Sequence, residues 1–567
     1  MSNLEIKGYE AKHITLVNNT FNDTDDALCI KENIHYSDGS IKPNLRLIKN
    51  WERPVYITKP GFRKHKEKKE SEKLSKLEKR MTNDRGRVKT IARSLGKHLT
   101  NSSLKKLARE PYVYGADISA PTLMKHHYMT KFPDLTSAST VAVLDIETDV
   151  VEGTEQILSV CITCNDKRYL AVNEWFVKGI PNVKDKIKRA FKKYLSKYDT
   201  PNIDLVIEVL PTPGACCQSA IAWAHTVKPD FMAVWNIDFD LPRIINALKR
   251  EHYDVAEVFS DPSIPVEYRD VWYKPGTDVK LTANGSTYTV PPQERWHVLN
   301  APSSFYWIDA MVVYAMIRKA KGLELSYSLD YILNKILGLR KLKFSFADHL
   351  NGIDWHFFMQ SEYKIEYLIY NMFDCIGVEE LDDKTKDLQI TLSELCGFSE
   401  IKNFNSTPTQ LADDLHFFYL EKGEVIASKS DQMSDDLDKH VIGMDGHIIT
   451  LATHLNQRNG IKPFVDFPNL ETLIRRYVSD LDVKSAYPYS EIFLNISKAT
   501  TRMELSKIER VSEIQKRAVA LNMTGGRVNS VETCTTVLGL KQLHELEDLF
   551  LADLEAGFGQ DLELEAA

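Results

Sequence analysis

The chain has 567 residues, a hydrophobic content of 43%, a charged content of 27% and a formal net charge of −7. This length predicts three or four domains, and the composition is typical of an ordinary soluble protein rather than a uniformly basic one. No apolar run approaches the ~18–20 residues that cross a bilayer, so we expect no membrane association. The start, MSNLEIKGYEAK, lacks the apolar core of a signal peptide, which predicts a cytoplasmic location.

Residues 1–140 are expected to form a mixed N-terminal domain. Short strand-like runs, LRLIKNW and PVYITK, precede a basic segment that reads as helical. Between Arg63 and Arg109 there are 17 Lys and Arg against 5 Asp and Glu. Such a run is compatible with a solvated helix held by i,i+4 pairs, or with a surface that faces a polyanion.

From residue 141 the pattern changes to strands that alternate with helices. VAVLDIET, QILSVCITC and RYLAVN read as strands, and VKDKIKRAFKKYLSKY and CCQSAIAWAHTV read as helices. This alternation predicts an α/β domain with a central sheet over 141–400. Cys161 and Cys164 are three apart on one predicted strand and therefore face opposite ways, which argues against a metal or redox pair.

Two carboxylates, Asp145 and Glu147, end the apolar strand VAVLDIETD. Residues i and i+2 of a strand face the same side, so both acids point together. Their burial is costly unless a cation neutralises them, and Mg²⁺ prefers such oxygen ligands. A strand end that emerges into solvent is the alternative reading.

Two further acids lie where they could join this pair. Asp240, in VWNIDFDLPRIINALKR, sits where a strand ends and a helix begins. This position also predicts a helix N-cap with Pro242 in the first turn, and a cap and a metal ligand can be the same residue. Asp374 and Tyr370 lie four apart on a helix with an apolar stripe, so both can address one point in space. A Tyr–Asp hydrogen bond on a half-exposed helix is the alternative for the second pair.

Two more features follow along the chain. Residues 279–290, VKLTANGSTYTV, predict a two-strand ribbon that closes on Asn284 and Gly285. Residues 309–400 are predicted to be mostly helical. In DLDVKSAYPYS, Asp480 and Asp482 share a strand face before a Tyr-Pro turn.

In this order, Asp-x-Glu on a strand, Asn236-x-x-Phe239-Asp240 before a helix, and Tyr370-x-x-x-Asp374 on a helix resemble the DEDDy 3′–5′ exonucleases. Within that group they are similar to the proofreading domain of family B DNA polymerases, and FYWIDAMVVYAMIRK, with Asp309, agrees. The resemblance implies a ribonuclease-H-like domain that hydrolyses 3′-terminal nucleotides of DNA with two Mg²⁺ ions, or Mn²⁺ in their place.

The resemblance also implies roles for the residues. Asp145 would bridge the two metal ions, Glu147 and Asp374 would bind the ion that carries the attacking water, and Asp240 would act on the second ion. Tyr370 would orient the nucleophile. Asn236 and Phe239 would contact a frayed single-stranded 3′ end.

The stretch around Asp482, with Ser485 and Tyr487, resembles motif A of a polymerase palm. The resemblance implies that Asp482 would bind the metal ions that hold the incoming dNTP and that Tyr487 would stack under its sugar and exclude a ribose 2′-OH. Ala486 departs from the usual Leu. Only 85 residues follow Asp482, and they contain neither a fingers motif nor an Asp-Thr-Asp-Ser hairpin. Residues 401–567 are therefore predicted to be a linker and a partial palm.

We expect the N-terminal, proofreading part of a polymerase of the T-even phage type, which acts on primer-template DNA in the host cytoplasm. A second polymerase subunit would supply the fingers, the rest of the palm and the thumb, and a truncated gene product is the competing explanation. Two other functions stay open, namely an autonomous DEDDy exonuclease and a nucleic-acid-binding regulatory subunit.

Overall fold

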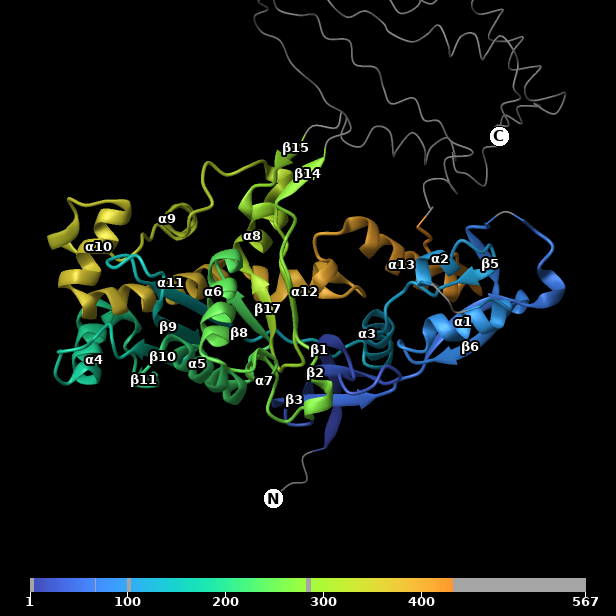
Figure 1. Cartoon of the computed structure of the whole chain (residues 1–567), viewed down its shortest axis with the longest axis horizontal. Helices are drawn as coiled ribbons and strands as arrows, with labels where there is room; N and C mark the ends of the chain where they lie inside the picture. Colours follow the sequence, from blue (N-terminus) through green and yellow to red (C-terminus); the bar gives the residue numbers. More distant parts are fainter. Residues whose placement is uncertain (1–4, 67, 99–102, 282–286, 432–567) are drawn as a thin grey trace, which may run out of the picture. The chain divides into compact units, whose positions relative to one another are not determined.

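The computed structural model describes residues 5–66, 68–98, 103–281 and 287–431 (Figure 1). All of them belong to the first of the two units into which the chain divides, residues 1–431. Asp482, Ser485 and Tyr487 lie outside the described residues, so the expected palm stays a prediction.

A six-stranded sheet forms the centre of residues 141–309. Its strand order is β11-β10-β9-β8-β12-β17. Strand β9 is antiparallel to both of its neighbours, and the remaining neighbouring pairs are parallel. The strands are β8 (Val141–Thr148), β9 (Ile157–Cys164), β10 (Lys167–Asn173), β11 (Asp204–Leu210), β12 (Phe231–Val234) and β17 (Tyr306–Asp309). The predicted mixture of strands and helices is confirmed.

Helices cover both faces of this sheet, because its central strands are apolar on both sides (Figure 1). One face packs against α4 (Val183–Tyr194), α8 (Ala310–Arg318), α9 (Leu329–Leu337) and α11 (Lys364–Thr385). The other face packs against α5 (Pro213–Val227), α6 (Ile237–Arg250) and α7 (Val255–Phe259). The predicted helical character of 309–400 is also confirmed, and α10 (Gly352–Glu362) adds to it.

Strand β8 alternates between these two cores. Val141 and Val143 pack on the side of α11, whereas Leu144 and Ile146 pack on the side of α6. The period of two therefore directs Asp145 and Glu147 toward α11. The same alternation in β9 places Cys161 in one core and Cys164 in the other, and both are free thiols.

Residues before 140 form two small sheets. The first has the order β1-β2-β3, and Ile14, Leu28 and Ile30 of this sheet pack against α3. The second has the order β6-β4-β7, and Val55 and Ile57 pack against α1 and α2. The elements are β1 (Ile6–Asn18), β2 (Asp26–Tyr36), β3 (Ile41–Lys49), β4 (Arg53–Thr58), β6 (Leu77–Thr82), α1 (Arg87–Leu95), α2 (Leu104–Leu107), β7 (Val113–Tyr114) and α3 (Ala120–Lys131).

The first part of the basic segment is not the helix that its Lys and Glu content predicts. It forms β5 (Ser71–Lys73), a 3₁₀ turn (Leu74–Lys76) and β6. Strand β6 pairs along its whole length with β4, and the side chain of Leu77, its first residue, is buried. Pairing and burial outweigh a local helix preference that is worth only tenths of a kcal/mol per residue.

The chain returns to the N-terminal region after residue 400. Helix α13 (Thr407–Glu421) leads to β18 (Glu424–Ile426), which pairs with β5. The backbone N–H of Ala116 donates to the Ser428 hydroxyl at 2.8 Å. The domain boundaries at 140 and 400 stay predictions.

The ribbon predicted at 279–290 is confirmed in its two strands. Strand β14 (Val279–Leu281) pairs antiparallel with β15 (Thr287–Thr289), and every residue of both is exposed. The turn residues Asn284 and Gly285 lie outside the described residues. A second ribbon, β13 (Trp272–Lys274) with β16 (Val298–Asn300), lies on either side of it in the sequence.

Candidate metal centre

Three of the predicted acids meet at the end of β8. Asp145 and Glu147 project from the strand and Asp374 from α11, and one carboxylate oxygen of each lies within 4.8 Å of the other two. Glu147 is 9% exposed and Asp374 is 4% exposed. Strand alternation brings Asp145 and Glu147 to one side of β8. Helix packing then adds Asp374, which lies more than 220 positions later in the sequence.

Burial and mutual repulsion act on the protonation of this cluster. Burial, followed by the charge of Asp374, raises the pKa of Asp145 to about 7. Burial and the charge of Asp145 raise the pKa of Glu147 well above its usual value. Like charges this close cannot all ionise at neutral pH without a compensating cation. The cluster therefore favours a bound positive charge.

Lys341 supplies one such charge. It lies in the loop after α9, and its ammonium donates to Asp374 Oδ2 and, at 3.0 Å, to the Tyr370 hydroxyl. Burial is the largest single influence and opposes the ammonium, but Asp374, Tyr370 and Asp145 together outweigh it and raise the pKa of Lys341 well above its usual value. Asp374 Oδ1 is buried without a hydrogen-bond partner in the described part of the chain.

Neutral side chains fix the orientation of the strand acids. Asn371 Nδ2 donates to Asp145 Oδ2 at 2.6 Å. The Tyr367 hydroxyl donates to Glu147 Oε2 and accepts from Gln360 Nε2 at 3.0 Å. Gln360 also donates to the Thr148 carbonyl at 2.8 Å, so the acids are held from α10 and α11 at once.

Lys341, Asn371 and Tyr367 were not predicted from the sequence. Helical spacing could have indicated two of them, because Tyr367, Asn371 and Asp374 lie at i, i+4 and i+7 on one face of α11. Lys341 has no such signal. It reaches the cluster from a loop whose course depends on the packing of α9.

Asp240 is not the N-cap that the sequence predicted. Helix α6 begins at Ile237 with Asn236 at the N-cap position, and Asn236 makes no side-chain cap bond. The helix starts early because Asp309 Oδ2 accepts the Ile237 N–H at 3.0 Å and so satisfies one of its free donors. Asp309, itself the N-cap of α8, is thus bound to two helix starts.

The Asp240 side chain instead reaches β8. It is 3% exposed, and its Oδ1 accepts the backbone N–H of Ile146 at 3.2 Å. Burial, then the charge of Asp145, raises the pKa of Asp240 well above its usual value. Asp240 therefore lies beside the acid cluster. It is not one of the three acids whose oxygens lie within 4.8 Å of one another.

Aromatic rings flank the centre. Tyr370, 7% exposed, has its ring 4.8 Å from that of Trp355 and stacks on Tyr367. Phe239 is 37% exposed, and the Arg243 guanidinium lies 3.8 Å from its ring centroid. Tyr370 is therefore held within the protein, whereas Phe239 presents a face to solvent.

The residues present fit a metal ion with oxygen ligands. Three carboxylates converge, and the partnerless Oδ1 of Asp374 leaves a buried acceptor that a cation would satisfy. Hard divalent cations take such ligands. Donor type and spacing do not by themselves specify which ion binds.

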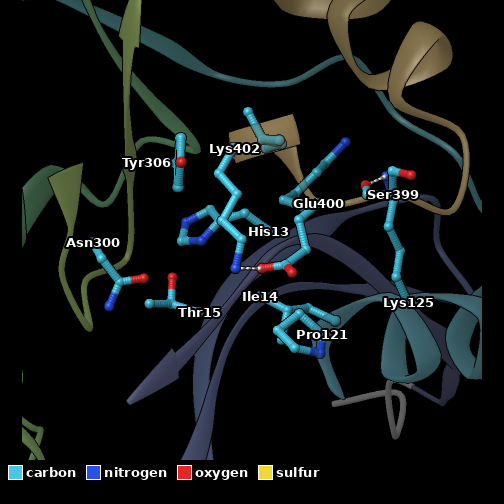
Figure 2. A pocket seen from close by; sticks show the side chains of 12 residues that line it. His13, Ile14, Thr15, Pro121, Lys125, Asn300, Tyr306, Ser399, Glu400 and Lys402 are labelled. Carbon is cyan, nitrogen blue, oxygen red and sulfur yellow. Dashed lines mark hydrogen bonds and ion pairs between the residues drawn. The ribbon is translucent and has the colours of Figure 1, made fainter. Parts of the chain in front are cut away.

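A separate polar cavity lies between β1, α3 and residues 399–402 (Figure 2). Both ring nitrogens of His13 are buried there without a partner in the described part of the chain, and burial lowers the pKa of His13 to about 3. Figure 2 shows Lys402 paired with Glu400, at 2.8 Å, and Lys125 donating to the Ser399 carbonyl, at 3.2 Å. The cavity volume of about 20 Å³ suits one or two water molecules.

Comparisons with known proteins leave the family open: no protein-family model matches the sequence, and no curated protein matches it either. Among the described residues, the helices are all too short or too polar to traverse a bilayer.

Proposed function

We propose that residues 141–400 form a metal-dependent 3′–5′ exonuclease domain that acts on DNA, the proofreading part of a family B DNA polymerase. The observation that carries this proposal is the convergence of Asp145, Glu147 and Asp374 within 4.8 Å. The order β10-β9-β8-β12-β17, with β9 alone antiparallel, supports a ribonuclease-H-like sheet.

Asp145, Glu147 and Asp374 would hold Mg²⁺, with Asp240 at the border of the site. Two such ions supply activation of a water molecule and stabilisation of the leaving 3′-oxygen in phosphodiester hydrolysis. Asn371 and Tyr367 keep the strand acids in their orientations, so little reorganisation is needed when substrate arrives. Each of these bonds uses one carboxylate oxygen, Oδ2 of Asp145 and Oε2 of Glu147, and leaves the other for a metal ion.

In this proposal Lys341 acts on the scissile phosphate and Tyr370 acts on the attacking water. Asp374 holds the Lys341 ammonium at the cluster, where it faces the negative charge of a scissile phosphate. The Tyr370 phenol stays protonated, because burial and then the charge of Asp374 raise its pKa above the usual value. It therefore donates a hydrogen bond and orients the attacking water.

The polymerase part of the proposal rests on the resemblance around Asp482 alone, which lies outside the described residues. We propose that a second polymerase subunit completes the palm. The isolated chain would then show no primer extension, and mixing with the second subunit would restore extension that Asp482→Ala abolishes. An autonomous exonuclease would digest DNA but gain no extension from any added subunit, and a regulatory binding protein would do neither.

The direct test uses the purified chain with a 5′-labelled single-stranded DNA. Stepwise shortening from the 3′ end with Mg²⁺, blocked by EDTA, is the expected result. A labelled strand that stays full length with Mg²⁺ and with Mn²⁺ would refute the exonuclease proposal. Binding of the same DNA without shortening would favour the regulatory subunit.

A further inference from the structure

A second cavity, of about 160 Å³, lies beside α6. It is bounded by residues 154–157, by Pro213 at the start of α5, and by the stretch of α6 from Arg243 to Glu251. We call it the α6 pocket. Its volume is several times that of the cavity at His13 and exceeds what one or two waters need.

The α6 pocket opens on the same edge of the sheet as the acid cluster. Strand β9 runs antiparallel to β8 and to β10, and β10 runs parallel to β11, so β8 and β11 point the same way. The carboxyl end of β8 carries the acids and continues into the loop that supplies residues 154–156. The carboxyl end of β11 leads to Pro213. Pocket and cluster therefore lie at the same edge of the sheet, with the acids directed toward α11 and α6 packed on the other face.

Helix α6 connects the two sites physically. Asp240 borders the acids. Phe239, Arg243 and Arg250 of the same helix lie at i, i+4 and i+11, which keeps them near one side of the helix. The Arg243 guanidinium stacks on the Phe239 ring at 3.8 Å and donates to the Phe239 carbonyl at 2.9 Å. From Phe239 to Arg250 the helix rises about 16 Å.

The two arginines of the pocket are incompletely paired. Arg243 Nε is buried without a hydrogen-bond partner in the described part of the chain. Among the described residues, Arg243 forms an ion pair with Glu155 at 3.8 Å, and the Glu155 side chain is 74% exposed. This pair therefore contributes little and is easily displaced. Arg250 is exposed and forms no ion pair with any residue that the structure describes.

The other acid of the pocket, Glu251, already accepts hydrogen bonds at the start of α5. Its Oε1 accepts the Gly214 N–H at 2.9 Å and its Oε2 accepts the Thr212 hydroxyl, so it caps the start of α5. Glu251 therefore forms no ion pair with Arg243 or Arg250, and the guanidinium group of Arg250 keeps its donors for a ligand, although the pocket lining holds two glutamates beside its two arginines. Guanidinium groups bind phosphate with paired hydrogen bonds.

We propose that the α6 pocket binds a backbone phosphate of the DNA strand, several nucleotides upstream of the 3′ end that enters the acid cluster. This inference rests on the proposed function, because it assigns the pocket to the same strand. Phe239 would stack on a base between the two sites, a contact that tolerates any base. The terminal nucleotide alone would not reach Arg250 across about 16 Å of helix.

The test measures binding and hydrolysis separately. Binding of a fluorescent oligo-dT of about ten nucleotides is followed by anisotropy in EDTA over a series of salt concentrations, for the full chain and for Arg250→Gln. Loss of one phosphate contact should weaken binding about three- to tenfold and reduce the slope of log affinity against log salt by about 0.7. Arg243→Gln should behave alike.

Lys249→Gln is the matched control, because Lys249 is exposed in the same last turn of α6 but does not line the pocket. It should leave the affinity and the salt slope within error of the unaltered chain. An unchanged slope in Arg250→Gln, or an equal loss in Lys249→Gln, would overturn the assignment.

Hydrolysis in Mg²⁺ distinguishes this inference from the proposed function. For Arg250→Gln, the ratio of the KM for the ten-nucleotide strand to the KM for a dinucleotide should rise severalfold, while kcat for the long strand stays within twofold. If the unaltered chain binds DNA with the expected salt slopes but hydrolyses none, the exonuclease proposal fails and the phosphate site stands. If the unaltered chain hydrolyses DNA, and Arg250→Gln changes neither the KM ratio nor the slope of log affinity against log salt, only the phosphate site is refuted.

Discussion

The Asp240 carboxylate accepts the backbone N–H of Ile146 at 3.2 Å, and Ile146 is the residue between Asp145 and Glu147 on β8. This bond ties the start of α6 to the strand that carries both acids. Asp240 therefore combines a structural contact with a negative charge beside the cluster, and the two contributions can be separated by substitution.

Asp240→Ala leaves the buried Ile146 N–H without its acceptor, which should lower the free energy of unfolding by about 1–3 kcal/mol. Asp240→Asn keeps an acceptor and removes a charge whose burial is costly, so its unfolding free energy at pH 7 should match or exceed that of the unaltered chain. Urea denaturation of both variants measures the difference. Equal stability of the two variants would show that the bond to Ile146 contributes nothing.

The acid cluster predicts an unusual dependence of stability on pH in EDTA. Burial, followed by the charge of Asp374, raises the pKa of Asp145 to about 7, whereas the pKa of an unfolded Asp is about 4. Between these two pKa values the folded state binds more protons than the unfolded state. The contribution of Asp145 to the free energy of unfolding is therefore fully present below about pH 4 and is lost as the pH rises through about 7.

Mg²⁺ should reverse that loss, because it binds the ionised cluster of the folded chain alone. The increase in melting temperature on adding Mg²⁺ should be larger at pH 8 than at pH 5. Asp145→Asn should flatten both trends, while Glu152→Gln, an exposed acid of the next loop, should not. A Mg²⁺ effect that is the same at both pH values would contradict a carboxylate site.

Lys341→Met removes the ammonium that neutralises Asp374 and keeps most of the aliphatic stem. Loss of a hydrogen bond to a charged, buried group should lower the unfolding free energy in EDTA by about 1.5–3 kcal/mol at pH 7. Lys335→Met is the control, because Lys335 pairs with Glu324 with 46% of its side chain exposed, and such a pair contributes at most about 1 kcal/mol. Equal effects of the two substitutions would show that the Lys341 contact is not special.

The β14–β15 ribbon carries exposed apolar side chains, with Leu281 at 74% and Tyr288 at 44% exposure. From the resemblance to proofreading exonucleases, we expect this ribbon to help separate a mispaired primer end from its template. Deleting Leu281 to Thr289, or changing Leu281 and Tyr288 to Ala, should slow digestion of duplex 3′ ends more than of single strands. Val266→Ala, which alters an exposed valine elsewhere, should slow neither, and equal rates after the deletion would mark the ribbon as inert.

Local patterns in the sequence were sufficient for much of this architecture. The period of two in VAVLDIETD placed Asp145 and Glu147 on one face, and the turn signal at Asn284-Gly285 predicted the ribbon strands. Helical spacing placed Tyr370 and Asp374 on α11. Each of these predictions depends on geometry within a few residues, which is set by the local sequence and does not require knowledge of distant contacts.

Contacts between distant segments were not predictable in this way. Lys341 reaches Asp374 from a separate loop, and Asp309 determines where α6 begins, so Asp240 lies inside the helix instead of at its cap. Likewise, β6 pairs with β4 where the local Lys and Glu content favours a helix. In each case a long-range partner outweighs a weak local preference.

We propose that Asp145, Glu147 and Asp374 hold the metal ions of a 3′–5′ exonuclease. The most direct test compares Mg²⁺-dependent shortening of 5′-labelled single-stranded DNA by the unaltered chain and by the Asp145→Asn/Glu147→Gln double variant, both shown to be folded by circular dichroism. We predict stepwise 3′–5′ digestion by the unaltered chain and a loss of about a hundredfold or more in the double variant. Undiminished digestion by the folded double variant would contradict the account.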